Sequence, residues 1–153
     1  MTYYFDSSGV VKIYLEEIGS DWVETICLQN SEGEVAISQI AGAEVCAALN
    51  RRHRSGDINT QTLEDALNAF ENDFTHFFVR IPVSLAIIKR AMKLIRRHPL
   101  RGYDAVQLAT ALEWADRLAA FGLAKPIFVS ADNVLNEAAV LEGLQTENPR
   151  NHP

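Results

Sequence analysis

Short apolar runs alternate along the chain with longer segments in which apolar residues recur every three or four positions. The runs predict strands at residues 2–5, 35–38, 77–81 and 126–130, and a last short strand at residues 144–146. The periodic segments predict helices at residues 8–17, 20–29, 39–53, 60–75 and 84–97, a long helix from Asp104 and a short helix after Asp132. Because strands that alternate with helices are typical of parallel sheets, we predict an α/β fold with an about five-stranded parallel sheet and helices on both faces.

The pattern also predicts which residues face the core and where the domain ends. The apolar positions expected to form the core stripe of the helix at 84–97 are Leu85, Ile88, Met92 and Ile95. Residues 148–153 are polar and include two prolines, which is typical of a flexible C-terminal tail. We therefore expect a single domain over residues 1–147.

Composition narrows the class of protein. The 153 residues are 48% apolar and 22% charged, as in ordinary globular domains. No apolar run approaches the roughly 20 residues of a membrane span, and no basic segment followed by an apolar stretch opens the chain. Cys27 and Cys46 are isolated, which favours reduced thiols. We predict a cytoplasmic protein with no membrane association.

Four acidic residues stand at positions that suggest a shared site. Asp6 and Asp132 leave the ends of predicted strands, where ligands bind in parallel sheets, and Asp104 begins a helix on its apolar face. Each of these three could instead cap a helix, although Ser7 and Ser8 could cap the first helix and free Asp6.

Glu44 is harder to explain as a structural residue. Its helical surroundings, residues 40–49, contain no other charge, and it is expected to lie too far into its helix to cap it. No basic residue stands three or four positions away to pair with it. Hard divalent cations such as Mg²⁺ and Mn²⁺ prefer carboxylate oxygens, so the four acids together predict a metal site. Such a site could act on a phosphodiester by activating a water molecule.

Basic residues are clustered, although the net charge is −6. The candidates for contact with a phosphate backbone are Arg51, Arg52 and Arg54, which follow the Glu44 helix, and Arg101, which precedes Asp104. The alternative is that these side chains only solvate helix ends, where cations are favoured.

The segments that carry the acids resemble a known family. Residues 4–15, which include Phe5-Asp6-Ser7-Ser8, the Glu44 helix, residues 98–109 and residues 128–132 look like the successive motifs of PIN-domain proteins, and most of all those of VapC-type toxins. The resemblance covers almost the whole chain. It implies a Mg²⁺- or Mn²⁺-dependent endoribonuclease that cleaves RNA.

The resemblance also implies roles for particular residues and for partners. Asp6, Glu44, Asp104 and Asp132 match the family's acidic quartet, and Ser8 matches a small polar residue that orients the first carboxylate. Such toxins form homodimers and are neutralised by a cognate antitoxin protein. A different class of function stays open, a non-catalytic binding module whose acidic pocket accepts a basic residue of a partner protein.

Overall fold

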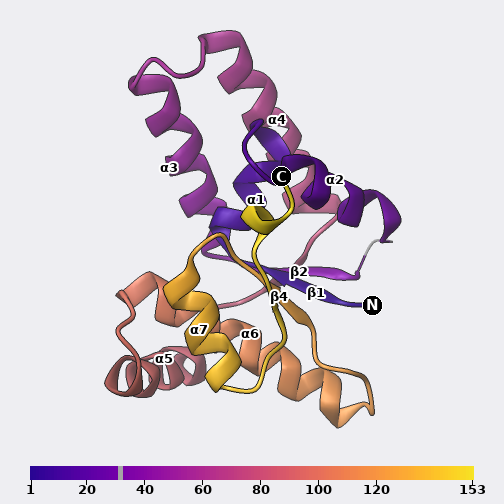
Figure 1. Ribbon diagram of the computed structural model, residues 1–153, viewed down its shortest axis with the longest axis vertical. Helices are drawn as coiled ribbons and strands as arrows, with labels where there is room; N and C mark the ends of the chain where they lie inside the picture. Colours follow the sequence, from indigo (N-terminus) through magenta and orange to yellow (C-terminus); the bar gives the residue numbers. More distant parts are fainter. Residues whose placement is uncertain (31–32) are drawn as a thin grey trace.

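A five-stranded parallel sheet forms the centre of the structure, a computed structural model that describes residues 1–30 and 33–153 (Figure 1). Its strands are β1 (Tyr3–Phe5), β2 (Val35–Ser38), β3 (Val79–Ile81), β4 (Ile127–Val129) and β5 (Thr146–Glu147). They lie in the order β3-β2-β1-β4-β5, and every neighbouring pair is parallel. The predicted parallel sheet is confirmed, with β2 at the predicted residues and the other strands displaced by one or two residues at one or both ends.

Helices cover both faces of this sheet. The helices packed on one face are α1 (Ser7–Tyr14), α2 (Ser20–Gln29), α3 (Ala41–Arg54) and α4 (Thr60–His76). Those on the other face are α5 (Leu85–Arg97), α6 (Gly102–Ala120) and α7 (Asn133–Leu141). Figure 1 shows the two layers above and below the sheet. The predicted α/β class is therefore confirmed.

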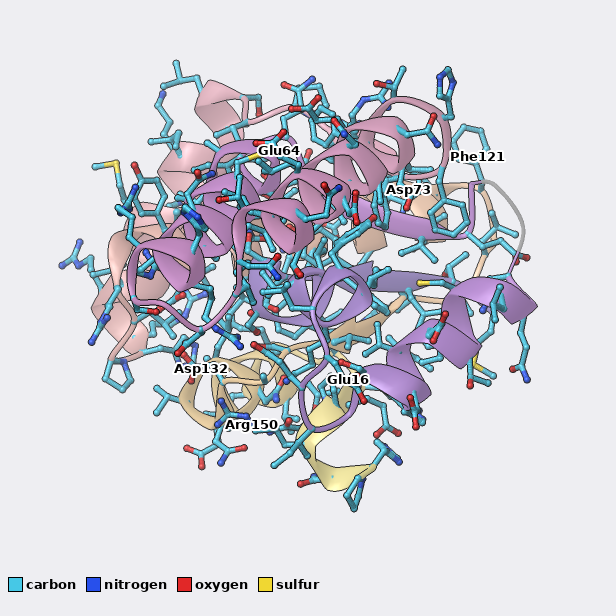
Figure 2. All side chains as sticks on the ribbon, turned by 90° about the horizontal axis from the view of Figure 1, so that it is seen from above. Glu16, Glu64, Asp73, Phe121, Asp132 and Arg150 are labelled. Atoms are coloured by element: carbon cyan, nitrogen blue, oxygen red, sulfur yellow. The ribbon has the colours of Figure 1, made fainter. Side chains whose placement is uncertain are left out.

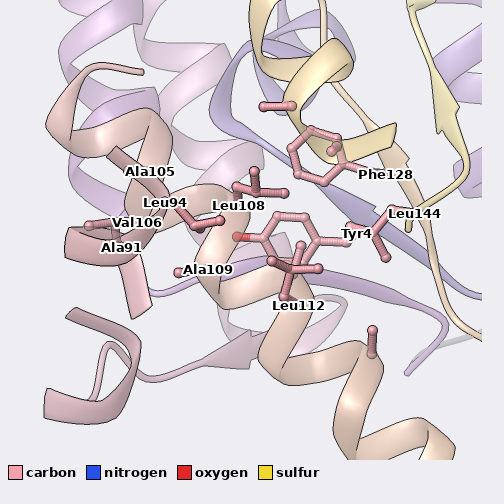
Figure 3. Packing of buried hydrophobic residues seen from close by; sticks show 14 of the residues in the cluster. Tyr4, Ala91, Leu94, Ala105, Val106, Leu108, Ala109, Leu112, Phe128 and Leu144 are labelled. Carbon is pink, nitrogen blue, oxygen red and sulfur yellow. The ribbon is translucent and has the colours of Figure 1, made fainter. Parts of the chain in front are cut away.

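Consecutive residues of β1 fill two separate cores. Tyr4 points to one face, where its ring stacks on Phe128 of β4 at a centroid distance of 5.7 Å and packs against the α6 residues Leu108 and Leu112 (Figure 3). Phe5 points to the opposite face and joins the core under α1 and α3. Because β1 is buried on both faces, its position is strongly fixed, and so is the residue that follows it.

The strand order places a switch point between β1 and β4. The chain adds β2 and β3 on one side of β1, and then crosses to the other side to add β4 and β5. In parallel sheets of this kind, ligands bind at the carboxyl ends of the two strands that flank the reversal. Asp6 directly follows β1 and Ser130 directly follows β4, so both lie at this point.

The predicted core stripe of α5 is wrong. The buried residues of this helix are Ile87, Ala91 and Leu94. The predicted positions are instead exposed, by 69% at Leu85, 37% at Ile88, 62% at Met92 and 43% at Ile95. Two apolar stripes run along the same helix, and the core takes the one that packs against the small residues of α6. Helical periodicity alone could not choose between them.

The C-terminal residues are also more structured than predicted. Pro149–Asn151 form a short 3₁₀ helix, η1, and the His152 ring stacks on Trp22 of α2 at a centroid distance of 4.3 Å. Residues 148–153, expected to be a flexible tail, thus contact α2. Cys27 and Cys46 are both unpaired. Within residues 1–30 and 33–153, no helix is both long and apolar enough to cross a membrane.

Candidate active site

Asp6 is held by three hydrogen bonds at the carboxyl end of β1. Its Oδ1 accepts from the Gly9 backbone N–H at 2.9 Å and from the Ser8 hydroxyl at 2.7 Å. Its Oδ2 accepts from the Ser130 hydroxyl at 2.6 Å. The Gly9 contact makes Asp6 the N-cap of α1, so the idea that Ser7 or Ser8 caps this helix in its place is wrong. Capping uses only Oδ1, and Oδ2 accepts a single hydrogen bond, so the capping role does not prevent the carboxylate from serving a site as well.

Burial makes Asp6 unusual as an anion. The residue is only 5% exposed, and this desolvation raises its pKa from 3.8 to about 6. Its three hydrogen bonds act in the opposite direction, while the charge of Asp104 raises the pKa further. Ionised Asp6 is therefore costly at neutral pH unless a positive charge lies nearby.

Two serine hydroxyls tie the ends of β1 and β4 together around Asp6. Ser8 donates to Asp6 and accepts from the Ala131 backbone N–H at 2.9 Å. Ser130 donates to the other oxygen of Asp6 and accepts from the Asp132 backbone N–H at 3.1 Å. The orienting contact expected of Ser8 is present in the structure. Ser130 has an equivalent contact that the sequence did not indicate.

Glu44 lies nearer to the start of its helix than predicted. Helix α3 begins at Ala41 and not at residue 39 as predicted, because Ser38 is the last residue of β2 and its hydroxyl accepts from the Ile40 backbone N–H in the turn that precedes the helix. Glu44 is therefore in the first turn of α3, not in the middle of the helix. Its Oε1 accepts from the Ser7 hydroxyl at 2.9 Å, which points the side chain toward Asp6 and the end of β1.

Gln107 is a site residue that the sequence analysis missed. Its Nε2 donates to Glu44 Oε1 at 2.8 Å and to the Ser7 hydroxyl at 3.0 Å, and its Oε1 accepts from the Tyr4 hydroxyl at 2.7 Å. Gln107 is 2% exposed, so these bonds satisfy the donor and acceptor groups of a buried side-chain amide. The available signal was a polar residue three positions after Asp104, on a helix face made otherwise of apolar and small residues.

Asp104 carries the least constrained carboxylate. It lies in the first turn of α6, whose N-cap position is Arg101 with no side-chain cap, so the capping alternative does not hold. Its carboxylate accepts no hydrogen bond from any residue that the structure describes. Burial raises its pKa most, the charges of Asp132 and Glu44 raise it further, and that of Arg101 lowers it. Asp104 is thus open to a ligand and repelled by its acidic neighbours.

Asp132 has both a structural role and a place in the site. It is the N-cap of α7, and its Oδ1 accepts from the backbone N–H groups of Val134 at 2.9 Å and Leu135 at 3.2 Å. The capping alternative is therefore confirmed for this residue. From the described part of the chain, its second oxygen, Oδ2, receives no hydrogen bond.

Three of the four acids surround one hollow, called here the acidic hollow. Glu44, Asp104 and Asp132 line its volume of about 500 Å³, together with Arg101. Asp6 does not line it, but its pKa responds to the charge of Asp104. Among residues 1–30 and 33–153, no group of three or more His, Cys, Asp or Glu side chains is positioned to hold a metal ion as it stands.

A second hollow, called here the basic hollow, adjoins the first at Glu44. It has a volume of about 350 Å³, and its lining includes Arg51 and Arg52 of α3. Arg54 is exposed at the end of α3 and lines neither hollow. The structure thus brings three of the four predicted arginines to the site and leaves Arg54 outside it.

The sequence is similar to a known protein family and to two named ribonucleases. It matches the family model described as PIN domain over residues 3–141. It is 35% identical over 113 residues to Ribonuclease VapC45 and to Ribonuclease VapC49, both of Mycobacterium tuberculosis. In each case the match covers 74% of this chain and 76% of the relative.

Solved structures share the fold. VapBC2 from Rickettsia felis, bound to a DNA fragment from its promoter, aligns with a TM-score of 0.60 at 15% identity and covers 97% of this chain and 98% of that one. A toxin–antitoxin complex from Klebsiella pneumoniae aligns with a TM-score of 0.55 at 18% identity, with the same coverage. Because the family model matches residues 3–141 of the 153, the chain belongs to the PIN-domain family.

Proposed function

We propose that this protein is a Mg²⁺- or Mn²⁺-dependent endoribonuclease and the toxin of a toxin–antitoxin pair. The observation that carries the proposal is the convergence of Glu44, Asp104 and Asp132 on one hollow at the carboxyl ends of β1 and β4, with Asp6 buried beside them. Two relatives at 35% identity are named ribonucleases, and proteins of the same fold occur in toxin–antitoxin complexes.

The donor set fits a hard divalent cation. Asp104 accepts no hydrogen bond, and Asp132 keeps one free oxygen, counting the described residues alone. Mg²⁺ retains several waters and needs only one or two carboxylates, so it does not require three acids already in contact. The pKa of Asp104 is raised in part by Asp132 and Glu44, a repulsion that a cation would relieve. We propose Asp104 and Asp6 as the direct ligands, with Glu44 and Asp132 acting more through water.

The chain's own residues hold this set in place. When bound, the ion would supply a Lewis acid and an attacking water of lowered pKa. Ser8 and Ser130 fix both oxygens of Asp6, and Ser7 and Gln107 fix one oxygen of Glu44. Such outer contacts orient the ligands of a metal ion and limit their rearrangement. The free oxygens of Glu44 and Asp132 are the groups able to accept protons from ordered water.

Basic side chains at the rim would bind the flanking phosphates of RNA. Arg101 lines the acidic hollow, and Arg51 and Arg52 line the basic hollow. Negative side chains alone repel a polyanion, so these cations and the metal make the site compatible with RNA. The antitoxin would compete for the same site, by placing a basic residue against carboxylates that the ion otherwise neutralises.

A second copy of the chain is proposed to cover the exposed stripe of α5. Leu85, Ile88, Met92 and Ile95 form an exposed apolar row along almost the whole of the helix, with spacing of three or four residues. Such a row is unfavourable in water and typical of an interface. Through the stripe, two copies would pack with their α5 helices facing each other.

A non-catalytic binding module is the competing function. Its acidic hollow would accept a lysine or arginine of a partner without any need for metal. Calorimetric titration with Mn²⁺ separates the two functions. The ribonuclease requires binding at millimolar metal or below, weakened in Asp104→Asn; no heat of binding at millimolar metal would favour the module.

Induction in cells tests the ribonuclease directly. Expression of the wild-type chain should inhibit growth and produce new ends in cellular RNA at a limited set of sites. Asp104→Asn should abolish both. Asp21→Asn is the matched control, because Asp21 is also an acid in the first turn of a helix, α2, but lines neither hollow. Equal RNA cleavage by Asp104→Asn and wild type would contradict the proposed function.

A further inference from the structure

The C-terminal segment carries an arginine to the rim of the candidate active site. Arg150, on η1, lines the basic hollow together with Arg51. It also lines a neighbouring hollow together with Ser8 and Asp132, and Figure 2 shows Asp132 and Arg150 near one another. Arg150 therefore borders two depressions, and Ser8 also lines both of them. Family motifs do not reach this residue, since the family model ends at residue 141.

Specific contacts on both sides of Arg150 hold it in place. Before it, Asn148 is 7% exposed, donates from Nδ2 to Asn133 Oδ1 at 2.8 Å and accepts from the Arg150 backbone N–H at 2.9 Å. After it, His152 stacks on Trp22. Gly19 has a φ of +90° and lies so close that an added Cβ would stand 2.2 Å from the Pro149 carbonyl oxygen. The segment is thus built against α2 and α7.

The charge of Arg150 is left without an internal partner. In the basic hollow, Lys12 pairs with Glu17 at 2.9 Å, and Arg52 pairs with the same carboxylate at 2.6 Å. Arg51 and Arg150 form no ion pair with any residue in the described ranges. Both are exposed, and together they leave an excess of positive charge in this hollow. The acidic hollow has the opposite composition, with three acids against Arg101.

We propose that Arg150 and Arg51 bind a backbone phosphate of the RNA strand on the Ser8 side of the cleaved bond. The inference rests on the proposed ribonuclease function and adds the path of the RNA strand across the site. The strand would run from the acidic hollow, past Glu44 and Ser8, into the basic hollow. A guanidinium binds phosphate through paired N–H donors, so two arginines suit one phosphate group. Arg150 is therefore a substrate-binding residue supplied by the C-terminal segment.

RNA binding without cleavage tests this assignment. Fluorescence anisotropy would follow a labelled single-stranded RNA pool of random sequence, with EDTA present to prevent metal-dependent cleavage. Arg150→Gln should weaken binding about tenfold at low salt, as expected for one charged hydrogen-bonding group. It should also reduce the slope of log K against log salt by about 0.7, the value for one phosphate contact on a single strand. Arg150→Lys should recover the slope but only part of the affinity.

Arg54→Gln is the matched control, because Arg54 is an exposed arginine on α3 that lines neither hollow. Equal RNA affinity and salt slope for wild type, Arg150→Gln and Arg54→Gln would overturn the assignment, while cleavage by the wild-type enzyme with metal would leave the ribonuclease function intact. A wild type that neither binds nor cleaves RNA would overturn both. Displacement of the RNA by polyglutamate at equal charge concentration would assign the basic hollow to an acidic protein segment and also overturn the proposal.

Discussion

Asp6→Asn should stabilise the protein at neutral pH in the absence of divalent metal, although it removes a proposed ligand. The carboxylate is 5% exposed and loses most of its hydration on folding. Asparagine has the same shape and needs no ionisation. Its Oδ1 can still accept from the Gly9 N–H and the Ser8 hydroxyl, and its Nδ2 can donate to the Ser130 hydroxyl. Asparagine is also as good an N-cap as aspartate.

The magnitude follows from the pKa of Asp6. Burial raises this pKa from 3.8 to about 6, so the folded state holds the proton more tightly than the unfolded state. The stability that protonated Asp6 gives the wild type is therefore fully present below a pH of about 4. It decreases as the pH rises to about 6 and is fully lost above that pH. At 1.36 kcal/mol for each pKa unit, the loss is about 3 kcal/mol. The asparagine side chain of the variant does not ionise, so the variant avoids this loss.

Urea denaturation in EDTA, followed by circular dichroism at several pH values between about 4 and 8, measures this difference. The stability of Asp6→Asn relative to wild type should rise with pH by about 3 kcal/mol and then level off. Added Mg²⁺ should stabilise the wild type more than the variant, because the variant has lost one of the two proposed direct ligands. A stability difference that does not change with pH, or one that favours the wild type more as the pH rises, would refute the reasoning.

Further changes test the supporting contacts. Gln107→Met removes both donors to Ser7 and Glu44 and should lower kcat for RNA cleavage roughly 10–100-fold with a smaller change in KM; an unchanged kcat would show that Gln107 does not position Glu44. Gly19→Ala should lower the free energy of unfolding by about 1–3 kcal/mol and speed hydrogen exchange in η1, since its Cβ would collide with Pro149; unchanged exchange there would contradict the packing. Met92→Glu should convert a dimer to monomers in sedimentation analysis, and a dimer that persists would place the interface elsewhere.

The sheet could be predicted because its three central strands, β2, β1 and β4, are largely buried on both faces. Residues such as Tyr4 and Phe5 serve opposite cores, so the strand reads as a continuous apolar run with no polar alternation. The acids that follow β1 and β4 could then be expected at one edge of the sheet. Their convergence depends on the direction of the strands, which the alternation of strands and helices predicts. It also depends on the order of the strands in the sheet, with β4 beside β1, which that alternation does not determine.

Contacts between distant segments could not be predicted in the same way. The contacts of Ser130 and Gln107 with the acids could not be predicted, because they depend on β4 and α6 lying beside β1. A lone serine or glutamine in a sequence has many possible structural roles. The predicted start of α3 at residue 39 is two residues too early, because β2 continues to Ser38 and the helix begins only at Ala41. The core face of α5 and the position of Arg150 depend on packing against other helices. The spacing of residues along the sequence carries no information about that packing.

Cleavage of RNA by the purified protein tests the proposed metal-dependent carboxylate centre most directly. Wild type, Asp104→Asn and Asp21→Asn would be incubated with total RNA in Mg²⁺ or Mn²⁺, and the wild type also in EDTA. We expect cleavage at discrete sites by wild type and Asp21→Asn with metal, and no cleavage in EDTA or by Asp104→Asn. Cleavage that persists in EDTA, or at the wild-type rate in Asp104→Asn, would contradict a metal-dependent ribonuclease built on these acids.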